Sequence, residues 1–494
     1  MHRTRWLKAF VSVFTVLALA SPTARAATID VTSFGATGDG IADDSPAIAK
    51  ALEAAVQAGP GATLVFPKRV YRMDAVKRGG GYYFDLKKLE RLTVEGNGST
   101  LRLHPHAGIL FVQECRHVAF RGFIIEHDPL PFTQGTIREV DTEHGEFTLA
   151  IDDGYGVPPA RVLGAAYRVG TSHQQSGFHG LRYWGVVMDP VEPHRRWGVN
   201  DFLHVDALMA VDNQPRMRRI KLTEAHVKLL TPVRPGDRFF LPLLATEDGR
   251  PIAQANVRIV RSSDCSVEDV TMYSGCNGMD FGIGRNEGLI TLRGVKIMLK
   301  PGSRNQTTTW RDGMHFKDNR IGPVIEDCYF EGLQDDSINI SASTAMAAQQ
   351  VSPTEFLLVG VQFDPGDRVL VCHPTSGRRT ETVVQSSERR PGALLRVVLK
   401  DPVGDVVPGR KQETDVLSTH FYNMTYANDG FVVRNCTFKP QRIRAILVRG
   451  CHGLVEGNTI EGVGGHGIAM LNEIGYFYEG PFPRDCVIRN NTIR

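Results

Sequence analysis

A six-residue pattern of apolar positions recurs along most of the chain. It reads apolar-x-x-(Cys, Asn or apolar)-x-apolar, which fits short strand-forming segments. Copies begin at Val94, Phe120, Val267, Leu292, Ile325, Val433, Val455 and Ile488. Five of the seven steps between them are 22 to 33 residues long. Strand-like repeats of that length are typical of a parallel β-helix, in which each repeat forms one coil.

Two of the steps are much longer, at 147 residues after Phe120 and 108 residues after Ile325. We expect each of these coils to carry an inserted domain. Both inserts place a Pro-Gly-Asp-Arg turn before an apolar strand, at Arg234–Leu241 and at Asp364–Val371. Two related small β-barrels are the simplest interpretation, and two unrelated hairpins with similar turns are the alternative.

The chain begins with the features of a secretory signal peptide in residues 1–26. Basic residues precede an apolar run from Ala9 to Ala20, and an Ala-x-Ala cleavage motif ends at Ala26. The run is too short to cross a bilayer, so we expect no membrane span and export to the periplasm or the medium. A helix is predicted next, because Asp44-Ser45-Pro46 is a helix start and apolar residues follow at helical spacing.

These patterns together predict an all-β protein, a parallel β-helix with an N-terminal capping helix and two inserted small β-barrel domains. The expected segments are the signal peptide at 1–26, the N-terminal cap and first coils at 27–127, the first barrel at 128–255, the catalytic coils at 256–342, the second barrel at 343–425 and the C-terminal coils at 426–494. Cys328 and Cys436 occupy the pattern position where Asn458 and Asn491 stand. We therefore expect mostly unpaired, buried cysteines rather than a disulfide framework.

The composition narrows the possible functions. Apolar residues make up 42% of the 494 residues and charged residues 22%, which excludes a disordered chain. Four of the 57 basic residues lie in the signal peptide, so the rest of the chain carries 53 bases against 54 acids. This balance argues against a large basic surface for nucleic acid. No CxxC, HExxH or Gly-rich phosphate loop occurs, and we expect no metal and no cofactor.

Four polar residues share one position on consecutive coils. Each stands two residues before an inward-facing apolar residue of the second strand of its coil. They are Asp312, Asp336, Arg444 and His466, and the second insert lies between Asp336 and Arg444. Because neighbouring coils lie about 4.8 Å apart, we expect the four side chains to form one polar column. Asp280, on the coil before, lies one residue out of this register.

Two close carboxylates are what glycosidic cleavage requires. One carboxylic acid protonates the leaving oxygen, while a second carboxylate activates water or attacks the sugar carbon. Asp312 and Asp336 fit this need, and Asp335 is a third acid if a turn or bulge at Leu333-Gln334 directs it to the same side. Mutual repulsion is expected to keep one acid protonated near neutral pH. The alternative is that the acids only cap turns, and the spacing does not choose between retaining and inverting chemistry.

Further residues beside these acids fit sugar binding. Arg442 and Arg444 offer donors for hydroxyl or carboxylate groups, with a solvated face as an equal alternative. His466 stands between two glycines and is either a site residue or a turn residue. The aromatic and acidic run Tyr476–Glu479 is either a sugar platform or a cover for one end of the core.

Several motifs resemble one known family. Residues Val31–Ser45 resemble the N-terminal cap of pectate-lyase-like β-helix proteins. The segments that resemble glycoside hydrolase family 110 are Asp312–Phe316, Ile325–Phe330, Asp335–Asn339, Arg444–Leu447 and Tyr476–Gly480. The resemblance extends over most of residues 29–494. Gln334 and Ser337 depart from the His and Pro that are common in the family at these positions, which leaves the galactose contacts open.

The resemblance implies a right-handed β-helix and an exo-acting glycoside hydrolase, an α-galactosidase that releases terminal α-1,3-linked galactose with inversion. It implies catalytic roles for Asp312, Asp335 and Asp336. The expected substrate contacts are His315, Asn339, Arg442, Arg444, His466, Glu473, Tyr478 and Glu479. A carbohydrate is the expected partner, no nucleic acid is expected, and the oligomeric state, monomer or homodimer, is left open.

Three other functions share parts of these patterns. A polygalacturonase-like hydrolase has a similar Asp before an Asp pair and a Gly-His-Gly like Gly465–Gly467, but it usually shows Asn-Thr-Asp where this chain has Trp310-Arg311-Asp312. A polysaccharide lyase acting on acidic chains needs a Lys or Arg base and usually Ca²⁺. A non-catalytic carbohydrate-binding β-helix binds glycans without turnover, and the three acids argue against it.

Overall fold

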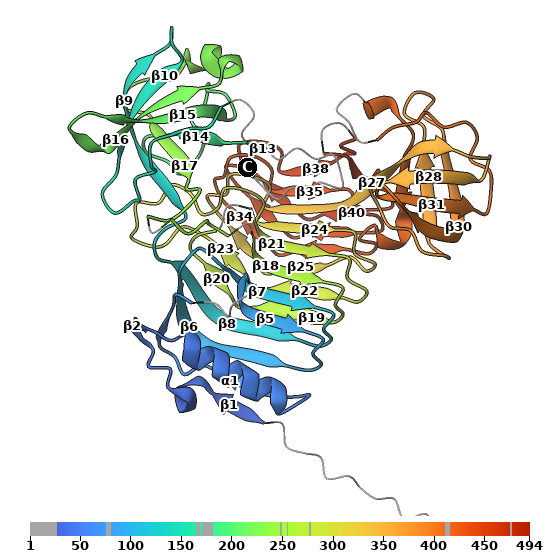
Figure 1. Cartoon of the computed structure of the whole chain (residues 1–494), viewed down its shortest axis with the longest axis horizontal. Helices are drawn as coiled ribbons and strands as arrows, with labels where there is room; N and C mark the ends of the chain where they lie inside the picture. Colours follow the sequence, from blue (N-terminus) through green and yellow to red (C-terminus); the bar gives the residue numbers. More distant parts are fainter. Residues whose placement is uncertain are drawn as a thin grey trace, which may run out of the picture.

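The computed structural model describes residues 27–75, 81–164, 168–169, 181–247, 249–253, 255–275, 278–410, 415–474 and 477–494. The signal peptide predicted for residues 1–26 lies outside these ranges. Within them the chain forms an elongated parallel β-helix from which two antiparallel barrels project (Figure 1). The prediction of an all-β parallel β-helix with two inserted barrels is confirmed. Among the described residues, no helix is long and apolar enough to cross a membrane.

A short cap covers the N-terminal end of the β-helix. It consists of β1 (Thr28–Asp30), the 3-10 turn η1 (Val31–Phe34), β2 (Asp39–Asp43) and α1 (Ser45–Gln57). The predicted helix is present, and Ile48, Ala51 and Ala55 are buried on the face that packs against the first coil. Asp44 stands at its N-cap, but the carboxylate makes no cap hydrogen bond and instead accepts from the Thr37 amide at 2.6 Å. Asp44 therefore fixes the turn before the helix.

The first long face of the β-helix contains the repeated six-residue pattern. Its strands are β3 (Thr63–Val65), β4 (Val70–Met73), β6 (Thr93–Leu103), β8 (Ala119–His127), β19 (Cys265–Glu268), β20 (Thr271–Met272), β22 (Ile290–Arg293), β23 (Lys296–Ile297), β25 (Val324–Glu326), β26 (Tyr329–Phe330), β33 (Val432–Arg434), β34 (Thr437–Phe438), β36 (Leu454–Glu456), β37 (Thr459–Ile460), β40 (Val487–Arg489) and β41 (Thr492–Ile493). The first residues of all eight copies, from Val94 to Ile488, are direct partners from one coil to the next. The repeat read from the sequence is therefore the coil itself.

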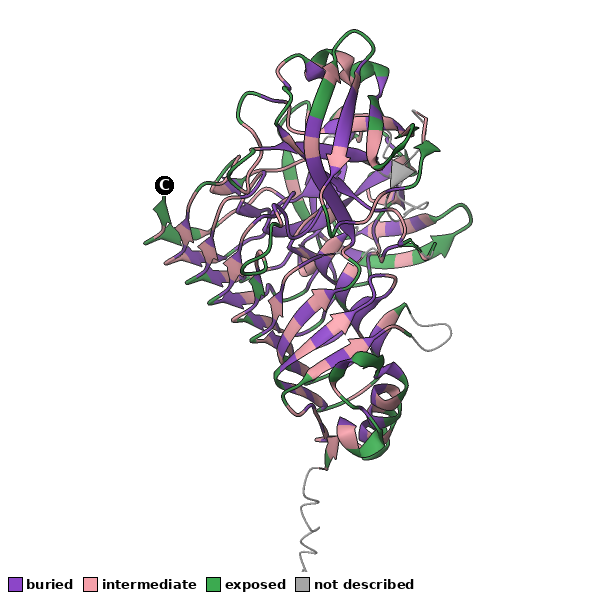
Figure 2. Ribbon diagram, turned by 90° about the vertical axis from the view of Figure 1, so that its left-hand side faces the viewer, coloured by how far each residue is buried: buried purple, intermediate pink, exposed green. Residues whose placement is uncertain are grey.

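The second parallel face positions the site. Its strands are β5 (Tyr82–Lys87), β7 (Gly108–Gln113), β18 (Ala255–Val260), β21 (Met279–Gly284), β24 (Met314–Lys317), β27 (Ile338–Gln350), β35 (Ile446–Val448) and β38 (Ile468–Met470). Met314, Ile338, Ile446 and Ile468 are partners on successive coils. Buried and less buried residues alternate along the strands, and the last two strands, next to the C-terminus, are exposed (Figure 2).

Each barrel is a closed ring of six antiparallel strands. The first contains β9 (Phe132–Asp141), β10 (Glu146–Ile151), β14 (Trp184–Met188), β15 (Leu203–Val211), β16 (Gln214–Leu222) and β17 (Arg238–Pro242). The second contains the far end of β27, then β28 (Glu355–Val359), β29 (Arg368–Cys372), β30 (Arg379–Arg390), β31 (Leu394–Leu399) and β32 (His420–Asn423). Numbered in chain order, the strands pair around both rings as 1-2-5-4-3-6. The two barrels thus share one topology.

The Pro-Gly-Asp-Arg turns have the same local structure in the two barrels. The Asp237 carboxylate accepts from the Arg234 amide at 2.8 Å, and the Asp367 carboxylate accepts from the Asp364 amide at 2.8 Å. The first turn precedes the sixth strand of its ring and the second precedes the third strand. These two places are equivalent because the ring order is unchanged when strands 1-2-3 are exchanged with strands 4-5-6.

The described cysteines are free, as the stacking pattern predicts. They are Cys115, Cys265, Cys328, Cys372, Cys436 and Cys451, which are buried, and Cys486, which is partly buried. Cys276 lies outside the described residues. The pairing of Tyr329 with Thr437 places Cys328 and Cys436 next to each other on successive coils. These thiols therefore serve as small apolar side chains of the core.

Candidate active site

The acids stand just before the strands of the second parallel face. The Gly313 amide donates to the Asp336 carbonyl at 2.9 Å, and the Ser337 amide donates to the Arg444 carbonyl at 3.1 Å. The Ala445 amide continues the ladder to the His466 carbonyl at 3.1 Å. The predicted column is therefore present in the backbone, with one member on each of four coils. The starts of these strands face the first barrel, while β27 runs on into the second (Figure 1).

Three carboxylates converge at the start of the column. Asp312, Asp335 and Asp336 each place an oxygen within 4.8 Å of the others. Asp335 reaches the cluster because the chain bends at Gln334 and Asp335 before β27 begins at Ile338. The Asp336 amide donates to Asp335 Oδ1 at 3.1 Å, which stabilises the bend. Two neighbouring acids are thereby turned toward one side, as the sequence interpretation requires.

The surroundings favour protonated forms of the neighbouring acids Asp335 and Asp336. Burial and the Asp312 carboxylate raise the pKa of Asp335 to about 6. Burial and the other two carboxylates also raise the pKa of Asp336 well above its usual range, although the guanidinium of Arg444 opposes this. Asp335 keeps a quarter of its side chain exposed, whereas Asp336 is 2% exposed. The cluster therefore holds a proton near neutral pH, and Asp335 is the member of the pair that a ligand can reach.

Arg444 and His315 hold two of the acids. The Nε of Arg444 donates to Asp336 Oδ1 at 2.7 Å. His315 Nδ1 lies 2.9 Å from Asp312 Oδ2. His315 Nε2 lies 3.3 Å from the Ser341 hydroxyl. These bonds fix the carboxylate planes of Asp312 and Asp336 against the β-helix.

The first barrel completes the site. Arg442 NH1 lies 2.6 Å from Asp201 Oδ2, just ahead of β15, and Arg442 NH2 lies 3.7 Å from Asp335 Oδ1. The guanidinium carbon of Arg442 is 5.0 Å from the ring centre of Trp184 in β14 and 5.9 Å from that of Phe202. Arg442 is thus enclosed by an acid and two aromatic rings of the barrel, and it connects the barrel to Asp335.

A second ion-pair network lies behind the column. Lys317 Nζ donates to Glu479 Oε1 at 2.8 Å, and Arg449 NH1 donates to Glu479 Oε2 at 2.8 Å. Arg449, which is fully buried, also bonds to Glu473 and donates to Asn339 Oδ1 at 3.0 Å. Despite burial, these cations lower the pKa of Glu479 to about 2. The carboxylate of Glu479 is therefore ionised, with both oxygens bound by protein cations.

The predicted sugar contacts do not all reach the acids. His315, Arg442 and Arg444 touch them, as described above. Asn339, Glu473 and Glu479 join the network around Arg449, and the buried Tyr478 lies beside the second barrel, 6.4 Å from the ring of His420. His466 is in register but its side chain is exposed. Direct contacts of these residues with a sugar stay predictions.

Sequence reasoning did not find Asp201, Trp184, Lys317, Arg449 and Ser341. For Lys317 a signal existed, since it alternates with the buried Met314 and Phe316 and so faces outward with His315. Asp201 and Trp184 come from the inserted barrel, and no periodicity relates the barrel to the coils.

The acid cluster has the donor atoms that a cation such as Ca²⁺ prefers. Two guanidinium groups already lie there, since Arg444 bonds to Asp336 and Arg442 approaches Asp335. These groups supply the positive charge that would otherwise favour a metal ion. The residues present therefore fit acid–base chemistry better than metal binding.

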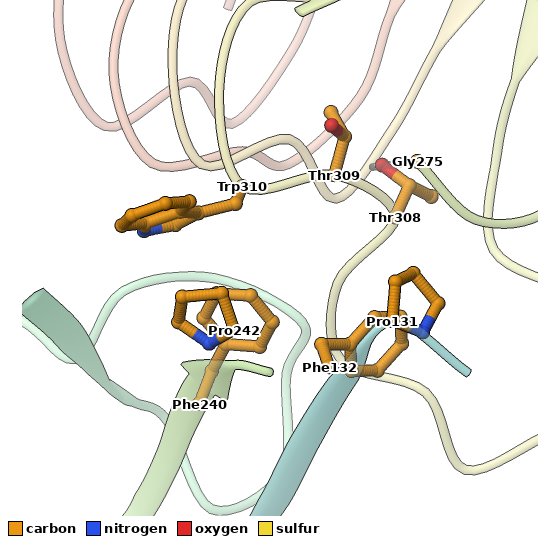
Figure 3. Close-up of a pocket in the computed structure, with 8 residues that line it drawn as sticks. All are labelled: Pro131, Phe132, Phe240, Pro242, Gly275, Thr308, Thr309 and Trp310. Atoms are coloured by element: carbon orange, nitrogen blue, oxygen red, sulfur yellow. The ribbon is translucent and has the colours of Figure 1, made fainter. Parts of the chain in front are cut away.

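A small apolar pocket marks the contact between the first barrel and the loop that leads to Asp312. It is lined by Pro131, Phe132, Phe240, Pro242, Gly275, Thr308, Thr309 and Trp310 (Figure 3). Trp310 faces Phe240 and Pro242 across the pocket (Figure 3). The lining has no ionisable side chain, so the pocket offers no acid or base. It shows instead that the loop before Asp312 is held by apolar packing.

Comparison with solved structures gives distant neighbours. A mannuronan C-5 epimerase A-module from Azotobacter vinelandii is 10% identical, with 89% of this chain and 73% of that chain covered and a TM-score of 0.33. A family 28 exopolygalacturonase from Yersinia enterocolitica is 12% identical, with 94% and 59% covered and a TM-score of 0.34. The fold assignment rests on the strand register of this chain.

Comparison with curated proteins gives long alignments, although no family model matches. Alpha-1,3-galactosidase B of Bacteroides thetaiotaomicron is 24% identical over 496 aligned residues, which cover 94% of this chain and 75% of the relative. Alpha-1,3-galactosidase A of Shewanella woodyi is 25% identical over 455 residues, which cover 85% of this chain and 68% of the relative. The resemblance to α-1,3-galactosidases inferred from the motifs is thus confirmed along most of the chain.

Proposed function

We propose that the protein is an exo-acting glycoside hydrolase that releases terminal α-1,3-linked galactose from glycans or galactans. The observation that carries the proposal is the cluster of Asp312, Asp335 and Asp336, which the fold assembles from two successive coils. Relatives that align along most of the chain carry the name alpha-1,3-galactosidase. Close carboxylates with unequal surroundings are what hydrolysis of a glycosidic bond needs.

Asp335 is assigned as the general acid. Its pKa of about 6 keeps the carboxyl protonated in weakly acidic solution, and its exposed quarter can reach a leaving oxygen. Asp312 is assigned as the base, since it is the remaining acid of the cluster and His315 Nδ1, 2.9 Å away, orients its carboxyl group. Asp336 is nearly covered and bound to Arg444, so it shares the proton of the cluster without meeting the leaving group.

The arginine and lysine side chains of the site are paired with acids, which favours a neutral sugar over a uronate. Arg442 is paired with Asp201 and Arg444 with Asp336, while Lys317 and Arg449 share Glu479. A polyuronate would need cations that are not already paired with protein acids, and each of these four cations has an acidic partner. Hydroxyl groups need only the remaining N–H donors of such cations. Galactose therefore fits this charge pattern better than galacturonate does.

The stereochemical course is proposed to be inverting, as in the family that the motifs resemble. Two-carboxylate inverting sites usually hold their acids about 6.5–9.5 Å apart, and retaining sites about 5 Å apart. The oxygens here lie within 4.8 Å, which taken alone favours retention. The anomeric configuration of the released galactose is therefore part of the test of this proposal.

The test is hydrolysis of α-1,3-galactobiose followed by proton NMR of the anomeric signals, beside an assay on polygalacturonate. Release of galactose as the β-anomer is expected, with no products from polygalacturonate. If the first product were α-galactose, the reaction would proceed with retention and not with inversion. Turnover of polygalacturonate alone would contradict the proposed substrate. Sequencing of the mature N-terminus after expression in a Gram-negative host tests the further proposal that residues 1–26 direct export.

A further inference from the structure

One ordered loop of the first barrel carries an unusually exposed aromatic residue. Residues 189–202 connect β14 to β15, and Trp197 in this loop is 62% exposed. The other tryptophans that the structure describes, Trp184 and Trp310, are 3% and 2% exposed. An exposed tryptophan offers a large flat apolar ring and an N–H donor to a ligand.

The loop is held firmly on both sides. Asp189 Oδ1 accepts from the amides of Val191 and Glu192 at 2.9 and 3.0 Å. The Asp189 carbonyl accepts from Gln306 Nε2 at 2.8 Å, which ties the loop to the β-helix. Arg196 NH1 donates to Asp237 Oδ2 at 2.8 Å, which ties it to the barrel. Trp197 is therefore presented by fixed backbone and needs little ordering when a ligand binds.

A continuous chain of contacts joins Trp197 to the acid cluster. The guanidinium carbon of Arg195 lies 5.8 Å from the Trp197 ring centre, and Arg195 NH1 donates to Asp201 Oδ1 at 3.2 Å. The other oxygen of Asp201 lies 2.6 Å from Arg442, which approaches Asp335. The loop that carries Trp197 is thus connected to the acid cluster through Arg195, Asp201 and Arg442.

Arg195 adds a polar group beside Trp197. Its side chain is 19% exposed, and its NH1 is fixed by Asp201. A flat aromatic ring beside a partly exposed guanidinium suits a pyranose, whose C–H face stacks on the ring while a hydroxyl accepts from an exposed N–H.

We propose that Trp197 and Arg195 form a subsite for the sugar residues that precede the terminal galactose, so that neutral oligosaccharides are the favoured substrates. The proposal rests on the galactosidase function proposed above and assigns its aglycone side. Terminal galactose would be held at the acids, and the following sugars would extend over the loop toward Trp197. Binding energy from that remote contact would raise kcat/KM for long substrates.

The kinetic test compares methyl α-D-galactoside with a trisaccharide that ends in α-1,3-linked galactose. Trp197→Ala is expected to lower the ratio of kcat/KM for the trisaccharide to kcat/KM for the methyl galactoside at least tenfold. Ile41→Ala, which removes an exposed apolar side chain in the N-terminal cap, serves as the matched control and should keep the wild-type ratio. An unchanged ratio in W197A would overturn the subsite while leaving the galactosidase function in place. Absence of galactose release from both substrates by the wild type would overturn both proposals.

Tryptophan fluorescence gives a second readout that needs no turnover. In the Asp335→Asn background the trisaccharide is expected to shift the emission to shorter wavelength by more than methyl α-D-galactoside does. This excess shift should vanish when Trp197→Phe is added, because Trp184 and Trp310 are already buried. An excess shift that persists without Trp197 would place the second sugar elsewhere and contradict the proposal.

Discussion

Asp201 of the first barrel forms a 2.6 Å ion pair with Arg442 of the β-helix, and the same guanidinium lies 3.7 Å from Asp335. Arg442 therefore divides its charge between an acid of the barrel and the proposed general acid. The inserted barrel thereby holds a cation beside the acid cluster, although it contributes none of the three acids.

Replacing Asp201 by Asn is expected to move the basic limb of the kcat/KM pH profile to lower pH. Loss of the Asp201 charge leaves Asp335 as the remaining acid paired with Arg442. A closer cation lowers the pKa of a carboxyl, here on the order of 1 unit. A general acid works only while protonated, so activity would be lost at lower pH than in the wild type. Asp212→Asn, at an exposed turn of the same barrel, is the control. Coincident profiles for D201N and the wild type would show that Arg442 does not act on Asp335.

The pH dependence of kcat/KM in the wild type should reflect the pKa of Asp335. Since burial and Asp312 raise the pKa of Asp335 to about 6, kcat/KM should fall as the pH rises through about 6. Initial rates on α-1,3-galactobiose from pH 4 to pH 9 measure this limb. A basic limb above pH 8 would exclude Asp335 as the acid that donates the proton.

Asp335→Asn should reduce hydrolysis of α-1,3-galactobiose by about 10²–10⁴-fold, the usual contribution of a general acid. An aryl galactoside with a strongly acidic phenol needs little protonation, so D335N should lose much less activity on it. Asp312→Asn removes the proposed base and should reduce the hydrolysis of both substrates by a similar factor. Equal losses on the two substrates in D335N would reverse the assignment of acid and base. Circular dichroism of each variant checks that the β-helix is retained.

The coils and the polar column could be predicted from the sequence because both follow from one repeating register. Val94 and Ile488 are nearly 400 residues apart, yet they belong to the same stack, since each coil adds one copy of the apolar pattern. Asp312 and Asp336 followed from the same register. Their pKa shifts did not, because those depend on how deeply each carboxylate is covered.

The rest of the site depends on packing between domains. Asp201 and Trp184 approach Arg442 only because the first barrel folds back onto the start of the column. No spacing along the chain encodes that approach. For His466 the register was predicted correctly, but the register did not predict that its side chain would be exposed.

Chelators should leave activity unchanged. Arg442 and Arg444 already supply positive charge beside the acids, so a divalent cation would bind there only weakly. Activity on α-1,3-galactobiose after dialysis against EDTA, with and without added Ca²⁺, measures the effect. Loss of activity that Ca²⁺ restores would show that the three carboxylates hold a metal ion.

The ion pairs around Glu479 should contribute strongly to stability, and in a pH-dependent way. Glu479→Gln would remove the carboxylate to which Lys317 donates and would leave the fully buried Arg449 with Glu473 alone. Breaking a buried pair costs about 3–5 kcal/mol in the free energy of unfolding. The pKa of Glu479 is lowered to about 2 in the folded protein, so its contribution is present above about pH 4.5 and is lost as the pH falls toward 2.

Urea unfolding of wild type and E479Q at pH 7, 5 and 3 tests the direction of this pH dependence. The wild type should be the more stable at pH 7 and pH 5, and its advantage should shrink at pH 3. Glu388→Gln removes an acid from an exposed pair with Arg390 and should change the urea midpoint little at any of these pH values. A wild-type advantage that grows on acidification would mean that Glu479 takes up a proton in the folded protein. Its two cations would then hold something other than a carboxylate.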